Sequence, residues 1–140
     1  MGFAGDIKCV GVVTGLFLFV LSAPAAEPLE DVQEAWEKGD YAVVVTKAVE
    51  ALKENEWKED FWVLQIRALM AQGKYEDALK TTAAALVKVS RGVRVRLLAE
   101  EVFRHNGDSE RADAMLAEIN QLAGSRAWAY RNAPDLVALG

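Results

Sequence analysis

The sequence has very few of the residues that usually carry out chemistry. It contains one cysteine, Cys9, and one histidine, His105, among 140 residues. Cys9 lies in an N-terminal segment that we expect to be removed, so the rest of the chain has no disulfide framework and no thiol chemistry. A zinc site needs about three or four ligands at close spacing, which a single histidine cannot supply. The sequence therefore predicts no metal, no cofactor and no catalytic residue.

Basic residues are also scarce relative to acidic ones. Lysine and arginine number 16 against 21 aspartates and glutamates, which gives a formal net charge of −5. Nucleic-acid-binding domains usually carry a concentrated basic face. The basic cluster here is RGVRVR at 91–96, and Glu100 and Glu101 follow it. We interpret this cluster as the solvated start of a helix rather than a phosphate site, and we expect no nucleic acid partner.

The first 25 residues differ in kind from the rest. A short leader, MGFAGDIK, precedes an uncharged apolar run at 9–21, and SAPAA follows with small residues at 23 and 25. This order is typical of a secretory signal peptide that is cut after Ala25. The alternative is an uncleaved anchor, but the run is shorter than the roughly 20 residues that a bilayer span needs. We therefore expect an exported protein, periplasmic or extracellular, with no stable membrane span after cleavage.

Three glycines divide the remaining chain at a fixed interval. Gly39, Gly73 and Gly107 are spaced by 34 residues. Five residues after each glycine comes a small or slim residue, namely Val44, Ala78 and Ala112. The apolar positions before the second glycine recur one period later: Phe61, Leu64, Ala68 and Leu69 become Val95, Leu98, Val102 and Phe103. Because the turn glycines and the apolar positions before them recur with the same period, the sequence predicts a repeated unit of helix, turn and helix.

The glycine of each unit is expected to end the first helix, where a left-handed backbone is needed. Asp or Ser just beyond the glycine can cap the second helix. One helix pair cannot bury its apolar face alone, so the pairs should stack into a solenoid. The pattern predicts helices at 28–38, 41–54, 59–71, 75–89, 92–105 and 108–122.

This 34-residue unit resembles the tetratricopeptide repeat. The middle unit has the family's residues at five positions: Trp62, Gly73, Tyr75, Ala78 and Ala85. The third unit departs from the pattern, because Arg96 stands where the family has tryptophan. The first helix is out of register, with an apolar face of Leu29, Val32 and Trp36. We expect the aromatic residues to pack in the core rather than form a ligand cage: Trp57, Phe61, Trp62 and Phe103.

The resemblance implies an all-α fold, with an α-solenoid of about three such units. A signal peptide at 1–25 should precede these units, and a short C-terminal helix should follow them. The repeat region should cover 26–124, with units at 28–56, 59–90 and 92–124. In the last segment, 125–140, Gly124 and Ser125 should start a short helix that carries Trp128 and Tyr130, and a new helix should begin near Pro134. This segment either caps the last pair or begins an incomplete repeat of a longer array.

In tetratricopeptide repeat proteins the first helix of each pair lines a concave groove that receives peptides. Carried over by position, the resemblance implies these groove residues: Gln33, Trp36, Arg67, Met70, Arg94, Glu101 and Arg104. Three arginines on one face would favour an acidic or carboxylate-bearing peptide. Family members that bind chaperone tails need a lysine and asparagine clamp, and only Arg94 and Gln33 fit its positions, so we do not expect that partner.

Three functions are left open by the sequence. The first is a non-enzymatic scaffold that binds a peptide or partner protein in the groove. The second is an accessory region of a longer exported enzyme such as a zinc peptidase, because the N-terminus resembles exported proteins in which repeats precede such a domain. The third is a structural oligomerisation unit in which the apolar DLVALG end at 135–140 stacks on a second copy.

Overall fold

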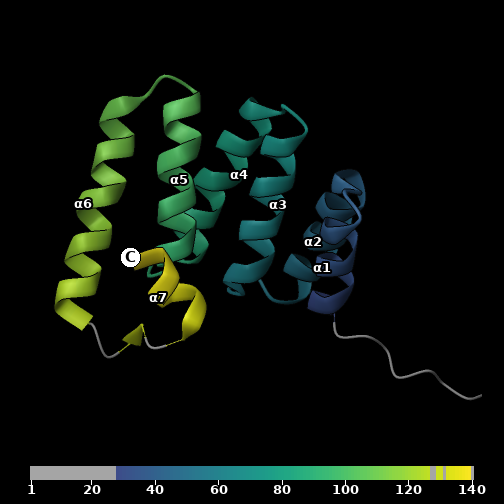
Figure 1. Ribbon diagram of the computed structural model, residues 1–140, viewed down its shortest axis with the longest axis horizontal. Coiled ribbons are helices and arrows are strands. Elements are labelled where there is room, and N and C mark those ends of the chain that lie inside the picture. The colour runs from purple at the N-terminus through teal and green to yellow at the C-terminus, as the bar shows by residue number, and fades with distance from the viewer. Residues whose placement is uncertain (1–27, 127–128, 131, 140) are drawn as a thin grey trace, which may run out of the picture.

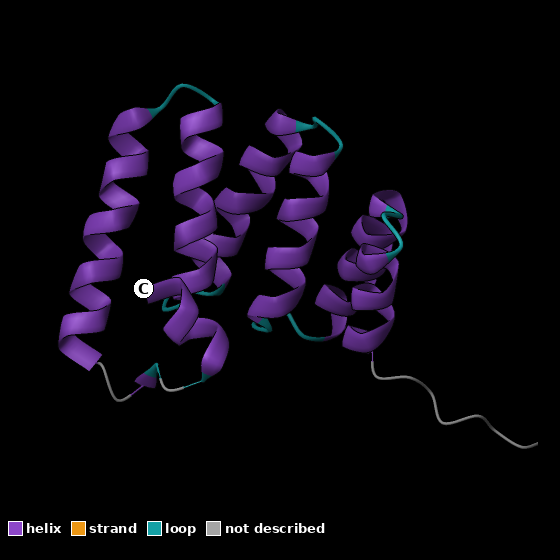
Figure 2. Cartoon of the chain, in the orientation of Figure 1, coloured by secondary structure: helices purple, strands orange, loops and turns teal. Residues whose placement is uncertain are grey.

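The computed structural model describes residues 28–126, 129–130 and 132–139 (Figure 1). The predicted signal peptide at 1–25, its cut after Ala25, and Trp128 lie outside these residues. Within the described part the regular secondary structure is helical (Figure 2). This confirms the predicted all-α class.

The described residues form seven α-helices, which stack in a row as three antiparallel pairs with a short helix after them (Figure 1). Their bounds are α1 (Pro28–Glu37), α2 (Tyr41–Glu54), α3 (Glu59–Ala71), α4 (Tyr75–Lys88), α5 (Val93–His105), α6 (Ser109–Arg126) and α7 (Ala133–Leu139). Consecutive helices from α1 to α6 contact one another, and α1, α3 and α5 also contact in series. This arrangement is an α-solenoid of helical repeats, as predicted.

The prediction was wrong at the end of α6. A new helix was expected to start at Gly124 and Ser125, but α6 continues through both residues to Arg126. Gly124 adopts no positive φ there, and the Ser125 hydroxyl donates a hydrogen bond back to the carbonyl oxygen of Leu122 at 3.3 Å. Both residues are therefore accommodated within a helix that they do not terminate.

The repeat glycines make the turns that the sequence predicted. Gly39, Gly73 and Gly107 have φ of 76°, 71° and 76°. At the second turn the amide of Lys74 donates to the carbonyl of Leu69 at 2.9 Å, which is the hydrogen bond that closes a helix before a left-handed glycine. A Cβ at any of the three glycines would meet nothing within 4 Å. Glycine is required at these turns by backbone conformation rather than by space.

Side-chain capping after the glycines is confirmed at one turn and not at another. The Asp108 carboxylate accepts a hydrogen bond from the amide of Arg111 at 2.9 Å, so it caps α6. Asp40 makes no such bond at the start of α2. The second expected cap is therefore wrong.

The core lies between the helices of each pair and between neighbouring pairs. The three small residues that follow the glycines, Val44, Ala78 and Ala112, are each 0% exposed. Phe61 and Phe103 are buried at 3% exposure. Trp57 is 69% exposed in the turn between α2 and α3, so its expected core position is wrong.

Arg96 takes over the hydrogen bond of the tryptophan that it replaces. Trp62 Nε1 donates to the carbonyl of Glu56 at 2.8 Å, and one period later Arg96 Nη2 donates to the carbonyl of Ser90 at 2.8 Å. Arg96 is 8% exposed, and its other nitrogens bond the Gly92 carbonyl at 3.1 Å and Glu118 at 2.8 Å. The interpretation of 91–96 as a solvated helix start is therefore wrong at this residue.

The start of α5 is capped by a side chain from the preceding pair. Glu59 Oε1, at the start of α3, accepts a hydrogen bond from the amide of Val95 at 2.8 Å. Burial raises the pKa of Glu59 above its ordinary value, while the Val95 amide and the Arg94 guanidinium act in the opposite direction. Gly92 lets this carboxylate approach, because a Cβ there would meet it and would lie 2.8 Å from Val89 Cγ1.

We expect Gly92→Ala to lower the free energy of unfolding by about 1–3 kcal/mol, because the displaced Glu59 carboxylate leaves the Val95 amide without its partner. Urea unfolding followed by far-ultraviolet circular dichroism measures this loss. Gly124→Ala is the matched control, because its Cβ would enter open space within α6. The control should gain about 0.5–1 kcal/mol from helix propensity. Equal losses from the two variants would contradict the proposed cap.

Candidate partner-binding groove

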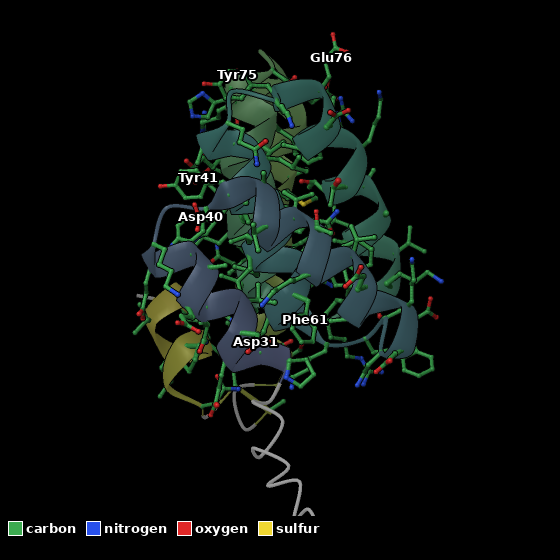
Figure 3. All side chains as sticks on the ribbon, turned by 90° about the vertical axis from the view of Figure 1, so that its right-hand side faces the viewer. Asp31, Asp40, Tyr41, Phe61, Tyr75 and Glu76 are labelled. Carbon is green, nitrogen blue, oxygen red and sulfur yellow. The ribbon has the colours of Figure 1, made fainter. Side chains whose placement is uncertain are left out.

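The first helices of the three pairs, α1, α3 and α5, form one face of the row. In Figure 1 this face is turned toward the viewer, with α3 in front of α4. In Figure 3, which views the row from the side of α1, the same face lies on the left, with Tyr41 and Tyr75 projecting from it. The predicted groove residues belong to these three helices, so this face carries the candidate groove.

Four of the seven predicted groove residues line one hollow of about 420 Å³ on this face: Trp36, Arg67, Met70 and Glu101. Its lining is completed by Ala71, Tyr75, Leu98 and His105. We call this the open hollow. The three helices thus bring together side chains that lie far apart in the sequence.

Two aromatic residues of the open hollow were missed as site residues. The rings of Tyr75 and His105 stack with centroids 5.5 Å apart and an interplanar angle of 10°. Tyr75 was predicted only as a residue of the repeat pattern, and no site role was predicted for His105. A signal was present, since Tyr41 occupies the same position after its glycine and packs on Trp36 with ring centroids 5.2 Å apart. The repeat tyrosines therefore mark the groove face.

Arg67 is the groove arginine that is available to a ligand. It is exposed, and it makes no ion pair with the residues that the structure describes. It lies in the open hollow with Glu101, beside the apolar surfaces of Trp36 and Met70. An exposed guanidinium next to apolar walls can bind a carboxylate of a partner with two parallel hydrogen bonds.

Arg94 is occupied by carboxylates of the chain itself. Its guanidinium contacts Asp60 at 2.7 Å, Glu59 at 3.3 Å and Asp135 at 3.2 Å. The side chain is 21% exposed. The interpretation of 91–96 as a solvated helix start is thus wrong here too, because acidic residues from α3 and α7 surround this arginine.

Arg104 and Gln33 do not line the open hollow. Arg104 pairs with Glu100 and, at 3.0 Å, with Asp113, and it lines a hollow of about 340 Å³ that shares Glu101 and His105 with the open hollow. Gln33 is exposed on α1 and lines neither hollow. The structure thus gathers Trp36, Arg67, Met70 and Glu101 and leaves the other predicted residues at its margins.

In the part of the chain that the structure covers, no three acidic, histidine or cysteine side chains are placed to hold a metal ion. Each helix in the same residues is too short or too polar to cross a bilayer.

The comparisons with known proteins bear on the first two helix pairs. Residues 25–92, which include α1 to α4, match the family model described as "Bacterial transcriptional activator domain". This is a non-catalytic family of tetratricopeptide-like helical domains, and there was no explicit match to the tetratricopeptide repeat itself. A search of curated proteins found no match. The first two helix pairs are therefore similar to a family of helical-repeat domains that are not enzymes.

Proposed function

We propose that this protein is a non-enzymatic binding module that holds a segment of a partner protein in the open hollow. One observation carries the proposal: residues that were expected to share a groove, Trp36, Arg67, Met70 and Glu101, line a single hollow. The stacked rings of Tyr75 and His105 add an aromatic wall to it. Concave sites with apolar walls and a few polar groups are where proteins commonly bind ligands.

The chemistry of the hollow favours a partner segment that carries an acidic side chain next to an apolar or aromatic one. Arg67 supplies the contact for the carboxylate, and Trp36 and Met70 supply the apolar contact. Glu101 lies in the same hollow and repels a segment with many acidic residues. Specificity would come from the spacing of one acidic and one apolar group.

We further propose that the protein acts after export, on the strength of the signal-peptide pattern at 1–25. The match over 25–92 supports a second candidate, in which the same groove serves a transcription regulator. An accessory role in a longer exported enzyme and self-association through the C-terminal segment also stay as alternatives. The exposed side chains of Leu136 and Val137, at 53% and 83%, support self-association.

Site-specific photo-crosslinking in the native cell tests the proposal. A photoreactive residue at Met70 should give a discrete adduct, and one at Val87, which is 76% exposed on α4 outside the groove, should not. Arg67→Glu should reduce the Met70 adduct at least about tenfold, the factor for a contact worth about 1.4 kcal/mol. The compartment of the adduct separates the exported scaffold from the transcriptional candidate. If Met70 and Val87 gave identical adducts, or if Arg67→Glu did not reduce the Met70 adduct, the proposal that a partner binds in the open hollow would be rejected.

A further inference from the structure

The C-terminal helix α7 lies over the groove face rather than extending the row. In Figure 1 it crosses in front of α5, and in Figure 3 it lies on the left side of the stack, away from α4. A second hollow of about 180 Å³ is lined by residues of α3, α5 and α7 together: Val63, Arg67, Arg94, Leu97, Leu98, Glu101, Pro134, Val137 and Ala138. It shares Arg67, Leu98 and Glu101 with the open hollow. The part of the groove next to the open hollow is therefore already occupied by the chain itself.

Two polar contacts hold α7 and its approach in this place. Asp135, in the first turn of α7, is 7% exposed and accepts a hydrogen bond from Arg94 Nε at 3.2 Å. The hydroxyl of Tyr130 donates to the carbonyl oxygen of Arg91 at 3.1 Å. Asn132 shapes the start of the helix, because its amide donates to the Asp135 carboxylate at 2.7 Å. The groove thus binds a short helix through one carboxylate, and Pro134, Val137 and Ala138 at the end of the chain line the second hollow.

Several features make α7 easy to exchange for another segment. Its helix has only seven residues, and helices of this length are marginal without their packing partner. When Asp135 leaves, Arg94 keeps its pairs with Asp60 and Glu59, so no buried cation loses all its partners. Leu136 and Val137 expose 53% and 83% of their surface, so much of the apolar surface of α7 is not buried in the groove. Release of α7 therefore leaves Arg94 with two of its three ion-pair partners and exposes little additional apolar surface of Leu136 and Val137.

We propose that α7 is an internal ligand of the groove, which a partner segment displaces. That segment has the chemistry of α7: a short helix with a carboxylate in its first turn and apolar residues behind it, at the place where α7 lines the second hollow with Val63 and Leu97. This inference rests on the proposed function, because it extends the same groove. A tethered segment competes at an effective concentration on the order of millimolar, so the partner must gain further contacts in the open hollow. Arg67, which lines both hollows, is placed to provide one.

The test uses a fluorescently labelled peptide with the sequence of residues 129–139, titrated into the purified protein and followed by anisotropy. Asp135→Asn in the protein removes the ion pair that holds α7 and should raise the affinity for the peptide about tenfold or more, because the internal competitor is weakened. A peptide that carries the same substitution should bind poorly to every protein variant. Asp113→Asn is the matched control, since it removes an ion pair of 3.0 Å with Arg104 outside the α7 contact. The control should bind the peptide as the unchanged protein does.

Equal peptide affinity for the unchanged protein and Asp135→Asn, or no binding to either, would overturn the internal ligand. An equal gain from Asp113→Asn would also overturn it, because the effect would then come from charge alone. The proposed function is judged separately by the Met70 adduct. If the Met70 adduct forms but the peptide does not bind, the proposed groove function is supported and the proposal that α7 is an internal ligand is rejected. If Asp135→Asn strengthens peptide binding but no Met70 adduct forms in cells, the internal ligand is supported and the proposed function fails.

Discussion

Ala78→Trp is expected to lower the free energy of unfolding by about 3 kcal/mol, the upper part of the range for overpacked cores. Ala78 is 0% exposed and belongs to a core cluster with Ile66, Leu69 and Val102. It stands five residues after Gly73, where α3 and α4 lie close together, and an indole ring cannot fit without separating them. The loss is measured by urea unfolding followed by circular dichroism.

Ala84→Trp provides the control for this prediction. Ala84 lies on the same helix and is exposed, so its replacement should change the free energy of unfolding by no more than about 0.5 kcal/mol. An unchanged unfolding midpoint for Ala78→Trp would show that α3 and α4 do not depend on a small residue at their crossing. The helical pairing of the repeat would then need another explanation.

Arg96→Ala is expected to lower the free energy of unfolding by about 2–3 kcal/mol, because it removes the hydrogen bonds of a largely buried charged donor to two carbonyl groups. The arginine is 8% exposed and donates to the carbonyls of Ser90 and Gly92. Its ion pair with Glu118 adds little to this figure, since the Glu118 side chain is 46% exposed. Thermal and urea unfolding both measure the loss.

Arg96→Trp distinguishes the role of Arg96 from a general need for a large side chain. Trp62 donates from its indole to the carbonyl of Glu56, so a tryptophan one period later should donate to Ser90 and regain at least half of the loss. Arg96→Met fills a similar space without a donor and should stay close to Arg96→Ala. If methionine restored stability as well as tryptophan, the hydrogen bond to Ser90 would not be the reason for Arg96.

The helices could be predicted because their signals are local. A glycine with positive φ and an apolar stripe of helical spacing need only neighbouring residues, so the helices from α1 to α5 end within one residue of their expected positions. The end of α6 could not be predicted in this way. Gly124 and Ser125 resemble a helix terminator by residue type, but Gly124 here keeps a helical backbone.

The part of the groove that depends only on the spacing of residues along the helices could be predicted from the sequence. Arg67 and Glu101, which are one period apart, face the same side because their helices repeat in register, and the structure places both around one hollow. The state of Arg94 depends on Asp60 and Asp135, which lie 34 and 41 residues away in the sequence. A repeat pattern in the sequence does not determine whether a long arginine side chain points to solvent or pairs with an acidic neighbour.

The polar contacts that Glu59 and Arg94 make between the second and third helix pairs also affect which pairs of the array unfold together. Glu59 of the second pair caps the third, and Arg94 of the third pair reaches back to Asp60 of the second. The first and second pairs meet mainly through apolar packing around Phe61 and Ala68, and Lys88 of α4 forms an ion pair of 2.6 Å with Glu56, which follows α2. In a linear array the strength of each junction sets which units open together. Loss of Glu59 or Arg94 therefore weakens the junction between the second and third pairs, while the junction between the first and second pairs depends mainly on its apolar core.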